Sequence, residues 1–570
     1  MSDRLQSILH FLPIFTGYST NPMTQFLDRY KYALIVAGIL VIYFFNLFID
    51  VMDIDAAQYA SISMEMAQSG NYLEVYHHGA DYLDKPPLLF WLSSLSMQLF
   101  GFNNFAYKLP SFLLVLLGLY STYRFALLYY SKKIATYAAF MLGTTQALFL
   151  ITNDLRTDTN LLVFVIFAVW QLAAFIQRNS WWNFFLGFTG VALAMMAKGP
   201  IGIVTIALAL GTDFILKKEW KWIFNWRWII GLIWVLIILA PMTYGLYTQF
   251  DLHPEKSAYG IDSPSGVKFF YWTQSFGRIT GESSWDNGAG FFFFFHSILW
   301  DFQPWMLYLI GGLIASIRWI VKGGMTAQKE FITLGGFVLT FLALSLSKFK
   351  LPHYIFVTFP FAAILAARFL VELKGTWALY VQGFLNLLFW ILCGVGLFLV
   401  FPIQNWVLPA ALLLLLVLAC IFFFRKTELS ERLLFGTITT IFAFNLVLSI
   451  HFYPQLINGY QSAGMAGKIA RTHGKDEGHF YYYLKHGHSM DFYYNSIVPS
   501  IGLESMENTL KKGDWVLTNE EGRTAIEQQK LPLVKKYKLP NFPVTGLKMQ
   551  FLIPDLRHEV VDSVYIFERK

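Results

Sequence analysis

The sequence is poor in cysteine and in charge. Its two cysteines, Cys393 and Cys420, both lie inside apolar runs, which excludes a disulfide framework and a cysteine-based metal centre. Charged residues make up 14% of the chain and hydrophobic residues 56%, with a mean hydropathy of +0.48. A soluble globular protein carries about 25% charged residues. This composition therefore excludes an ordinary soluble protein and indicates a membrane protein.

Two other features are missing. Residues 1–29 lack a basic start followed by an apolar stretch and a small-residue cleavage site, so we expect no cleaved signal peptide. The net charge of +7 and pI near 9.0 resemble those of a nucleic-acid binder. However, the basic residues lie in short loops between apolar runs, where they report membrane topology. We therefore expect no nucleic-acid partner.

Long apolar runs dominate the remainder of the chain. A run of about 20 apolar residues is long enough to cross a membrane as a helix. We predict thirteen such spans, and the count depends on whether residues 183–216, interrupted only by Lys198-Gly-Pro, form one span or two. The runs lie near 32–50, 110–129, 134–152, 159–177, 183–197, 200–216, 228–247, 293–317, 331–346, 353–371, 377–400, 405–424 and 433–451.

Charge predicts the orientation. With the N-terminus in the cytoplasm, the inward loops are rich in lysine and arginine, whereas the first outward loop, within 50–109, holds seven acids and two lysines. We predict a cytoplasmic segment at 1–29, a transmembrane domain at 30–451 with its first outer loop at 51–109, and an outer domain at 452–570. The last region alternates helix-like and β-like stretches, which is typical of a small α/β domain.

Polar residues gather in the outward loops at the helix ends. These loops contain Asp53-Ile-Asp55, Asp84-Lys85-Pro-Pro, Asp154-Leu-Arg156-Thr-Asp158, Lys198-Gly-Pro, Arg278, and Lys350-Leu-Pro-His353-Tyr354. Acids and bases from five loops on one side of the membrane predict a shared polar pocket. Such a pocket suits a substrate with hydroxyl groups and a phosphate, because lysine and arginine neutralise phosphate and a carboxylate can serve as a base. Tyr59–Ala67 and Leu88–Leu99 have the spacing of amphipathic interfacial helices.

One long motif in the first outer loop resembles a known family. The motif reads Asp53-Ile-Asp55-Ala-Ala-Gln-Tyr59, then Gly70-Asn-Tyr, then Tyr82-Leu-Asp-Lys85-Pro-Pro-Leu-Leu-Phe-Trp91 and Phe100-Gly101. It is similar to that of GT-C glycosyltransferases of the protein O-mannosyltransferase superfamily, and within it to the bacterial aminoarabinose transferases that modify lipid A. The similarity extends over about residues 30–365.

The resemblance implies a polytopic helical GT-C fold in the bacterial inner membrane, with a periplasmic C-terminal domain. It implies sugar transfer from a polyprenyl-phosphate donor with inversion at C1. Asp55 would be the base or acceptor-orienting carboxylate, supported by Asp158 and Asp53, and Lys85 would bind the donor phosphate. We assign further substrate contacts to Arg156, Tyr59, Tyr82, Lys198, Arg278, Lys350, His353 and Tyr354. The sequence departs from the family at Ala56 and Gln58, where glutamate and arginine are common.

Several alternatives stay open. The sugar could be 4-amino-4-deoxy-L-arabinose or a hexose, and the acceptor lipid A, another glycan or a protein hydroxyl, the last describing a protein O-glycosyltransferase. A transporter or flippase is the rival from another class, although it would place ionisable groups near mid-span. We expect no resident cofactor and predict no metal site, because His77-His78 and His486-Gly-His488 are interpreted as surface histidines. Metal dependence stays open.

Overall fold

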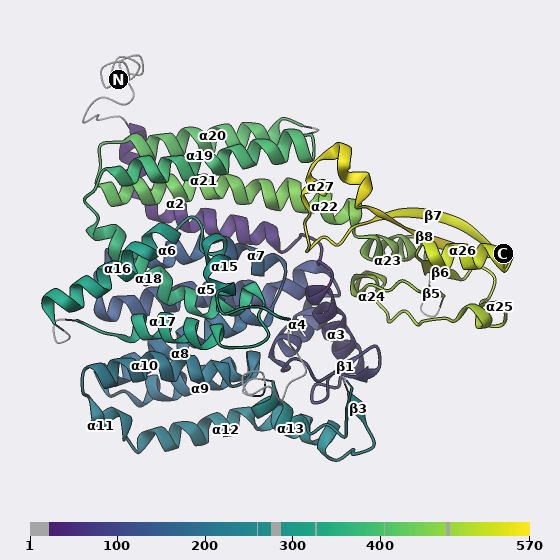
Figure 1. Ribbon diagram of the computed structural model, residues 1–570, viewed down its shortest axis with the longest axis horizontal. Helices are drawn as coiled ribbons and strands as arrows, with labels where there is room; N and C mark the ends of the chain where they lie inside the picture. Colours follow the sequence, from purple (N-terminus) through teal and green to yellow (C-terminus); the bar gives the residue numbers. More distant parts are fainter. Residues whose placement is uncertain are drawn as a thin grey trace.

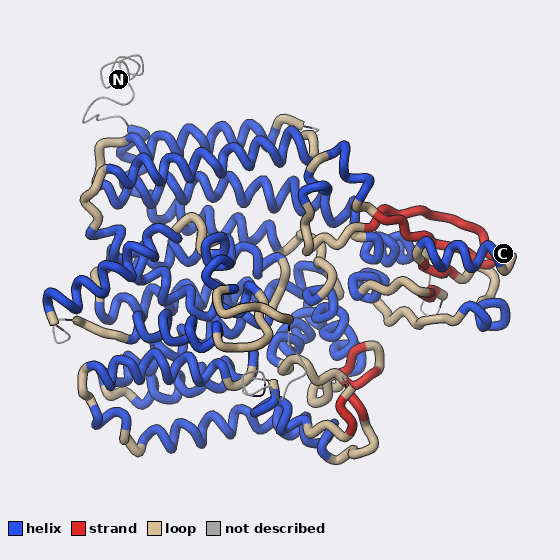
Figure 2. Tube along the Cα trace, viewed as in Figure 1, coloured by secondary structure: helices blue, strands red, loops and turns tan. Residues whose placement is uncertain are grey.

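The computed structural model describes residues 22–258, 260–274, 277, 287–324, 328–403, 405–474 and 479–570. Most of these residues form a bundle of long helices that run in roughly the same direction, with a small α/β unit beyond one end of the bundle (Figures 1 and 2). Two shorter helices lie between the bundle and this unit (Figure 1). Because of this arrangement, one end of the bundle is covered by loops and by the unit.

The bundle follows the apolar runs of the sequence. Its first half contains α2 (Pro22–Asn46), α5 (Asn104–Tyr129), α6 (Lys132–Gly143), α7 (Gln146–Asn153), α8 (Thr157–Arg178), α9 (Trp181–Lys198), α10 (Ile201–Leu216), α11 (Trp220–Ile223) and α12 (Arg227–Leu246), which continues as η1 (Tyr247–Asp251). Its second half contains α15 (Phe293–Asp301), α16 (Met306–Gly323), α17 (Ile332–Ser345), η4 (Pro352–Thr358), α18 (Phe359–Glu372), α19 (Trp377–Gly394), η5 (Val395–Val400), α20 (Val407–Phe424), α21 (Leu429–Val447), η6 (Leu448–Phe452) and α22 (Tyr453–Tyr460).

Seven helical segments of the described chain are long and apolar enough to cross a membrane, or eight if the bent pair α6–α7 forms one span. Each predicted run overlaps at least one helix. However, the prediction of one uninterrupted span over 293–317 is wrong. The run is divided into α15 and α16, and Pro304 lies in the break, where its missing amide cannot donate to a continuing helix.

The run over residues 183–216 forms two helices, α9 and α10, with the break at Lys198-Gly-Pro. Gly199 ends α9 with a φ of 83°, a left-handed conformation that favours glycine, and Pro200 precedes α10. The two helices then pack closely, because a Cβ on Gly202 would lie 2.7 Å from the carbonyl carbon of Ala194. The small size of Gly202 therefore permits the close contact between α9 and α10 after the turn.

The first outer loop is mostly helical. It contains α3 (Asp55–Ser69), the hairpin β1 (Tyr76–His77) and β2 (Ala80–Asp81), and α4 (Leu88–Phe100). Both predicted amphipathic helices are therefore present. A second two-stranded hairpin, β3 (Ser257–Ala258) and β4 (Ile261–Asp262), lies in the later outer loop, before α13 (Gly266–Lys268) and η2 (Phe269–Thr273).

The C-terminal unit contains a four-stranded sheet. Its elements are α23 (Ser462–Thr472), β5 (Phe480–Tyr483), α24 (His488–Tyr494), η7 (Leu503–Ser505), α25 (Met506–Thr509), β6 (Trp515–Thr518), α26 (Glu520–Gln528), β7 (Leu533–Asn541), α27 (Met549–Leu552), η8 (Pro554–Glu559) and β8 (Asp562–Arg569). The strand order is β5-β6-β8-β7, with β5 and β6 parallel and the other pairs antiparallel. The sequence did not indicate β7, a lysine-bearing edge strand with a register shift between Lys535 and Tyr537.

The unit binds the chain just before α3. The hydroxyl of Tyr493 accepts a hydrogen bond from the amide of Val51 at 2.7 Å, and the Gln461 side chain donates to the Val51 carbonyl at 2.8 Å. Lys468 forms an ion pair with Asp50. These contacts fix the segment that leads into Asp55, so the unit helps to set the position of the first residue of α3.

Candidate active site

Five predicted site residues lie where helices begin or end at the covered end of the bundle. Asp55 begins α3, Arg156 caps α8, Asp158 lies in the first turn of α8, Lys198 ends α9, and His353 lies in the first turn of η4. Because α8 and α9 are successive antiparallel helices, the start of the first meets the end of the second. The topology therefore brings these separate loops to one place.

Arg156 joins two carboxylates. Its Nη1 donates to Asp55 Oδ2, while its Nε and Nη2 donate to Asp154 Oδ2 at 3.0 and 2.6 Å. Burial alone would lower the pKa of Arg156, but the two carboxylates outweigh burial and raise it, so the guanidinium stays charged. The Asp55 side chain is still 38% exposed, whereas that of Arg156 is 14% exposed. Asp55 is thus held by a cation and remains open to a substrate.

A second set of basic side chains lies around Asp158. Lys198 donates to Asp158 Oδ1, and His353 Nε2 lies 3.7 Å from Oδ2 of the same carboxylate. The Lys198 ammonium also lies 3.7 Å from the ring centroid of Tyr354, within cation–π distance. The Asp158 side chain is only 3% exposed. It therefore orients the Lys198 and His353 side chains.

Lys85 and Tyr59 both belong to the first outer loop. Lys85 forms an ion pair with Asp84, and the backbone carbonyl of Asp84 accepts a hydrogen bond from Gln274. Tyr59 is buried, which raises its pKa well above its usual value, and the nearby charges of Asp55, Asp84 and Asp158 raise it further. The charges of Asp84 and Asp158 therefore both act on Tyr59, which follows Asp55 by one turn of α3.

A cavity of about 890 Å³ opens at Asp55 and Arg156. Apart from these groups, its walls are largely apolar and come from α7, η4, η5, η6 and the segment around α27, with Leu150, Phe356, Val395, Val447, Phe452, Val544 and Leu552 among the lining residues. Asp301 also lines it. This acid is 5% exposed, and its Oδ2 has no hydrogen-bond partner among the described residues. The only sequence signal for Asp301 is that it is a single acid within an aromatic run.

Other predicted site residues have structural contacts instead. Asp53 accepts from the backbone amide and the hydroxyl of Ser489 at 2.9 and 2.7 Å, so its carboxylate faces the C-terminal unit. Tyr82 is buried against Phe90 in the core of the first outer loop. Lys350 is buried and donates to the Ala289 carbonyl at 2.7 Å. Arg278 lies outside the described residues.

The contact between Asp53 and Ser489 gives a pH prediction. Burial raises the pKa of Asp53, against the lowering effect of the Ser489 hydrogen bonds, so the folded state binds this proton more tightly than the unfolded state. Its contribution to stability is complete below the unfolded value of about 3.8 and is lost as pH rises through the higher folded value. Melting curves between about pH 4 and about pH 7 should show this loss in the wild type and a smaller one in Asp53→Asn. An unchanged pH dependence in the variant would contradict the assignment.

Comparisons with known proteins identify the fold that carries these side chains. Residues 84–244 match the family model described as dolichyl-phosphate-mannose-protein mannosyltransferase. In the solved structure of ArnT from Cupriavidus metallidurans bound to undecaprenyl phosphate, the similarity covers 94% of this chain and 97% of that one, with a TM-score of 0.72 and 17% identity. This chain has a GT-C glycosyltransferase fold. The apo form of the same protein matches with a TM-score of 0.67.

Two curated relatives match part of this chain. The undecaprenyl phosphate-alpha-4-amino-4-deoxy-L-arabinose arabinosyl transferase 2 of Sodalis glossinidius is 28% identical over 60% of this chain and 59% of its own length. The corresponding transferase of Edwardsiella ictaluri is 27% identical over 59% of this chain and 58% of its own length. The chain thus matches about three fifths of the length of these relatives. An uncharacterized protein of Aquifex aeolicus is 25% identical over 82% of this chain.

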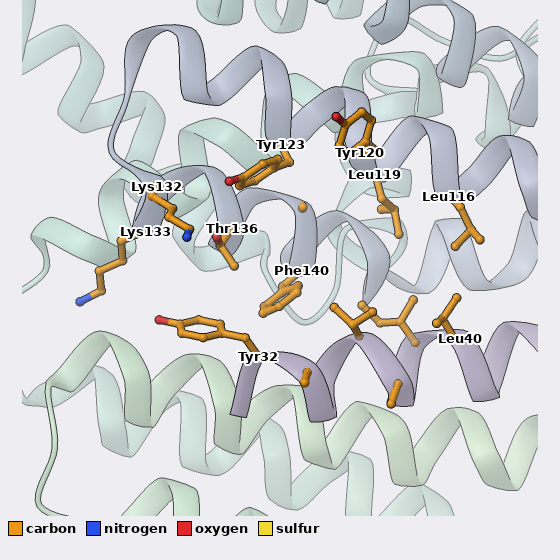
Figure 3. A pocket seen from close by; sticks show the side chains of 15 residues that line it. Tyr32, Leu40, Leu116, Leu119, Tyr120, Tyr123, Lys132, Lys133, Thr136 and Phe140 are labelled. Carbon is orange, nitrogen blue, oxygen red and sulfur yellow. The ribbon is translucent and has the colours of Figure 1, made fainter. Parts of the chain in front are cut away.

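A second cavity of the GT-C bundle shares no lining residue with the cavity at Asp55. It measures about 970 Å³ and is formed by α2, α5 and α6, with mostly apolar walls and with Lys132 and Lys133 at one end (Figure 3). Lys132 begins α6, and the chain runs from there through α6 and α7 before it reaches Asp154. This cavity is therefore separate from the candidate active site.

The histidines form a cluster that the sequence interpretation missed. His78, His486 and His488 are partly buried and converge with the buried Asp491. Their interpretation as separate surface histidines is wrong, because the hairpin β1–β2 folds back onto α24 and brings positions 400 residues apart together. Spacing in the sequence could not reveal a contact made only by this fold.

Proposed function

We propose that this protein transfers a sugar from a polyprenyl-phosphate donor to an acceptor of the bacterial envelope. The observation that carries the proposal is the amphipathic cavity, in which Asp55 and Arg156 meet walls of aliphatic and aromatic side chains. A lipid-linked sugar phosphate has the same division, with a polar reactive head and an apolar tail. The GT-C fold and the charged groups around Asp158 and Lys85 agree with this assignment.

The chemistry follows from the positions of the charges. Asp55 accepts a proton from a hydroxyl acceptor, or orients an acceptor that is already anionic, while the acceptor oxygen attacks the sugar C1 in line. The bond from C1 to the phosphate oxygen breaks, the lipid phosphate leaves with the electron pair, and C1 is inverted. Lys85 and Lys198 neutralise the leaving phosphate, and Arg156 holds Asp55 in position.

The names of the similar proteins support this donor class. The relatives from Sodalis and Edwardsiella are named for undecaprenyl phosphate and 4-amino-4-deoxy-L-arabinose, the matched structure contains undecaprenyl phosphate, and the family model is named for dolichyl-phosphate-mannose. All are polyprenyl phosphates or their sugar derivatives. We infer that the donor here belongs to the same class, with lipid A as the first acceptor to test and a protein hydroxyl as the second.

The proposed location is the inner membrane, with the C-terminal unit of residues 452–570 in the periplasm. The distribution of lysine and arginine among the loops supports this orientation, as does the position of Asp55, Lys198 and His353 at the helix ends predicted to face outward. Polyprenyl-phosphate sugars and lipid A are both membrane-bound, so a site at the membrane surface would reach donor and acceptor together.

Mass spectrometry of the envelope tests the transfer. Lipid A and envelope proteins are isolated from cells with and without the gene, and from cells that carry Asp55→Asn. We expect a sugar mass increment on one acceptor only in cells with the wild-type gene. The same increment in gene-free cells, or no difference in either acceptor pool, would contradict the proposal.

Lys85→Ala separates donor from acceptor recognition. If Lys85 contacts the donor phosphate, its loss should raise the KM for the donor about tenfold or more, with the KM for the acceptor nearly unchanged, since a charge-assisted contact contributes about 1.5–3 kcal/mol. Kinetics with purified protein and both substrates measure the two values. Lys268→Ala, which removes an exposed lysine of α13, is the control. Equal increases for both substrates would argue against a donor-phosphate contact.

A further inference from the structure

The histidine cluster joins two parts of the molecule outside the candidate active site. His78 lies in the turn of the β1–β2 hairpin, whereas His486, His488 and Asp491 lie at the start of α24 in the C-terminal unit. One ligand atom from each of the four residues lies within 4.8 Å of the other three. The cluster therefore spans the contact between the loop that carries Asp55 and the unit that covers it.

The backbone holds the four side chains toward one point. His78 has a φ of 56°, and the amides of His78 and Gly79 both donate to Glu65 of α3, at 3.0 and 2.9 Å. His488 begins α24 and Asp491 follows three residues later, so both lie on one face of the helix. The Glu65 carboxylate and the left-handed backbone conformation of His78 therefore fix the position of the His78 side chain.

The contacts within the cluster centre on one carboxylate oxygen. Asp491 Oδ2 lies 2.9 Å from His78 Nε2 and 3.3 Å from His486 Nε2. The ring centroids of His486 and His488 are 5.0 Å apart. The Asp491 side chain is fully buried, and its Oδ1 accepts from the Val498 amide at 3.0 Å, which fixes the carboxylate plane. Three imidazoles thus face one oriented carboxylate.

We propose that His78, His486, His488 and Asp491 bind a structural zinc ion. Three imidazoles and one carboxylate match the ligands and the coordination number that zinc prefers. Tetrahedral zinc with bonds of about 2.0–2.2 Å places its ligand atoms about 3.3–3.6 Å apart. The four ligand atoms lie within 4.8 Å of one another, so side-chain rotations would have to draw them together to reach that geometry.

The polar balance of the cluster favours a metal over a simple histidine–carboxylate network. The buried Nδ1 of His488 has no hydrogen-bond partner among the described residues, which is costly for a ring nitrogen unless something else binds it. Asp491 contacts the rings of His78 and His486, but the Nδ1 of His488 has no partner in the described part of the chain.

Zinc here would link the first outer loop to the C-terminal unit. Ser489, between the ligands His488 and Asp491, donates both hydrogen bonds to Asp53, two residues before Asp55. The ion would therefore stabilise the segment that positions Asp55 without contacting the substrate. We expect its removal to loosen this junction and lower the melting temperature.

Metal analysis of the purified full-length protein, without a polyhistidine tag, tests the site. After dialysis into metal-free buffer we expect about one zinc per chain in the wild type, and at least about a fivefold lower content in His78→Ala and His486→Ala. His253→Ala, which removes an exposed histidine outside the cluster, is the matched control and should retain zinc. Zinc chloride added to chelator-treated wild type should raise its melting temperature.

A second measurement on the wild type covers the case in which the variants do not fold. Cobalt chloride added to the stripped protein should give the intense visible absorption of tetrahedral Co²⁺, and zinc should abolish it. Wild type that retains no transition metal and gives neither this absorption nor a thermal shift would overturn the proposal. Folded His78→Ala and His486→Ala variants with wild-type zinc content would also overturn it.

Discussion

Asp55→Asn should lower sugar transfer to a hydroxyl acceptor about 10²–10⁴-fold, with donor affinity changed far less. Asparagine keeps the shape of the side chain and can still contact Arg156, but it cannot accept the proton of the attacking group. Turnover of purified protein with a polyprenyl-phosphate sugar, together with direct donor binding, separates the two effects.

The control for this variant is an acid away from the cavity. Asp262→Asn alters an exposed carboxylate in β4 and should leave turnover unchanged. Near-normal turnover of Asp55→Asn with a hydroxyl acceptor would remove the general-base role. If the acceptor is an anionic phosphate, Asp55 need only orient it, and the loss should lie at the lower end of the range.

Arg156→Gln should have the second largest effect, on both stability and activity. It leaves Asp55 and Asp154 facing each other without their common cation, and breaking a buried ion pair on one side costs about 3–5 kcal/mol. Because Asp55 is more than one third exposed, solvent screens its share, and we expect the lower end of that range. Thermal unfolding in detergent and transfer assays measure the two losses.

A second substitution separates charge from packing. In Arg156→Gln/Asp154→Asn the unpaired Asp154 charge is gone, so the double variant should unfold at a higher temperature than Arg156→Gln alone, although activity should stay low. Stability losses that simply add would show that the two side chains do not interact. Such additivity would contradict the arrangement in which Arg156 joins both carboxylates.

The sequence predicted the site mainly through helix ends. Asp55, Arg156, Asp158, Lys198 and His353 all lie next to long apolar runs, so counting the runs assigns them to one side of the bundle. The pair Lys198–Asp158 follows from antiparallel packing of the consecutive helices α8 and α9, whereas Arg156–Asp55 and His353–Asp158 join segments far apart in the chain. Assigning these residues to one end of the bundle required no knowledge of contacts between distant segments.

The same logic failed where the C-terminal unit makes the contacts. The sequence predicts that Asp53 supports Asp55, whereas in the structure the Asp53 carboxylate accepts hydrogen bonds from Ser489 of α24. The four residues of the histidine cluster belong to two segments whose contact depends on how the unit docks on the hairpin. Asp301 faces the cavity because Pro304 ends the helix that a continuous span would have formed. Apart from Pro304 and the isolated acid at position 301, none of these features has a local signal in the sequence.

Photolabelling tests the central claim most directly. A polyprenyl phosphate with a photoreactive group in its tail is irradiated with the purified protein, and the labelled residues are mapped by mass spectrometry. We predict labels on residues that line the cavity below Asp55 and Arg156, such as Leu392, Val395 and Val447, and competition by unlabelled polyprenyl phosphate. Competed labels confined to the cavity of Leu40, Leu116 and Lys132 would contradict the account.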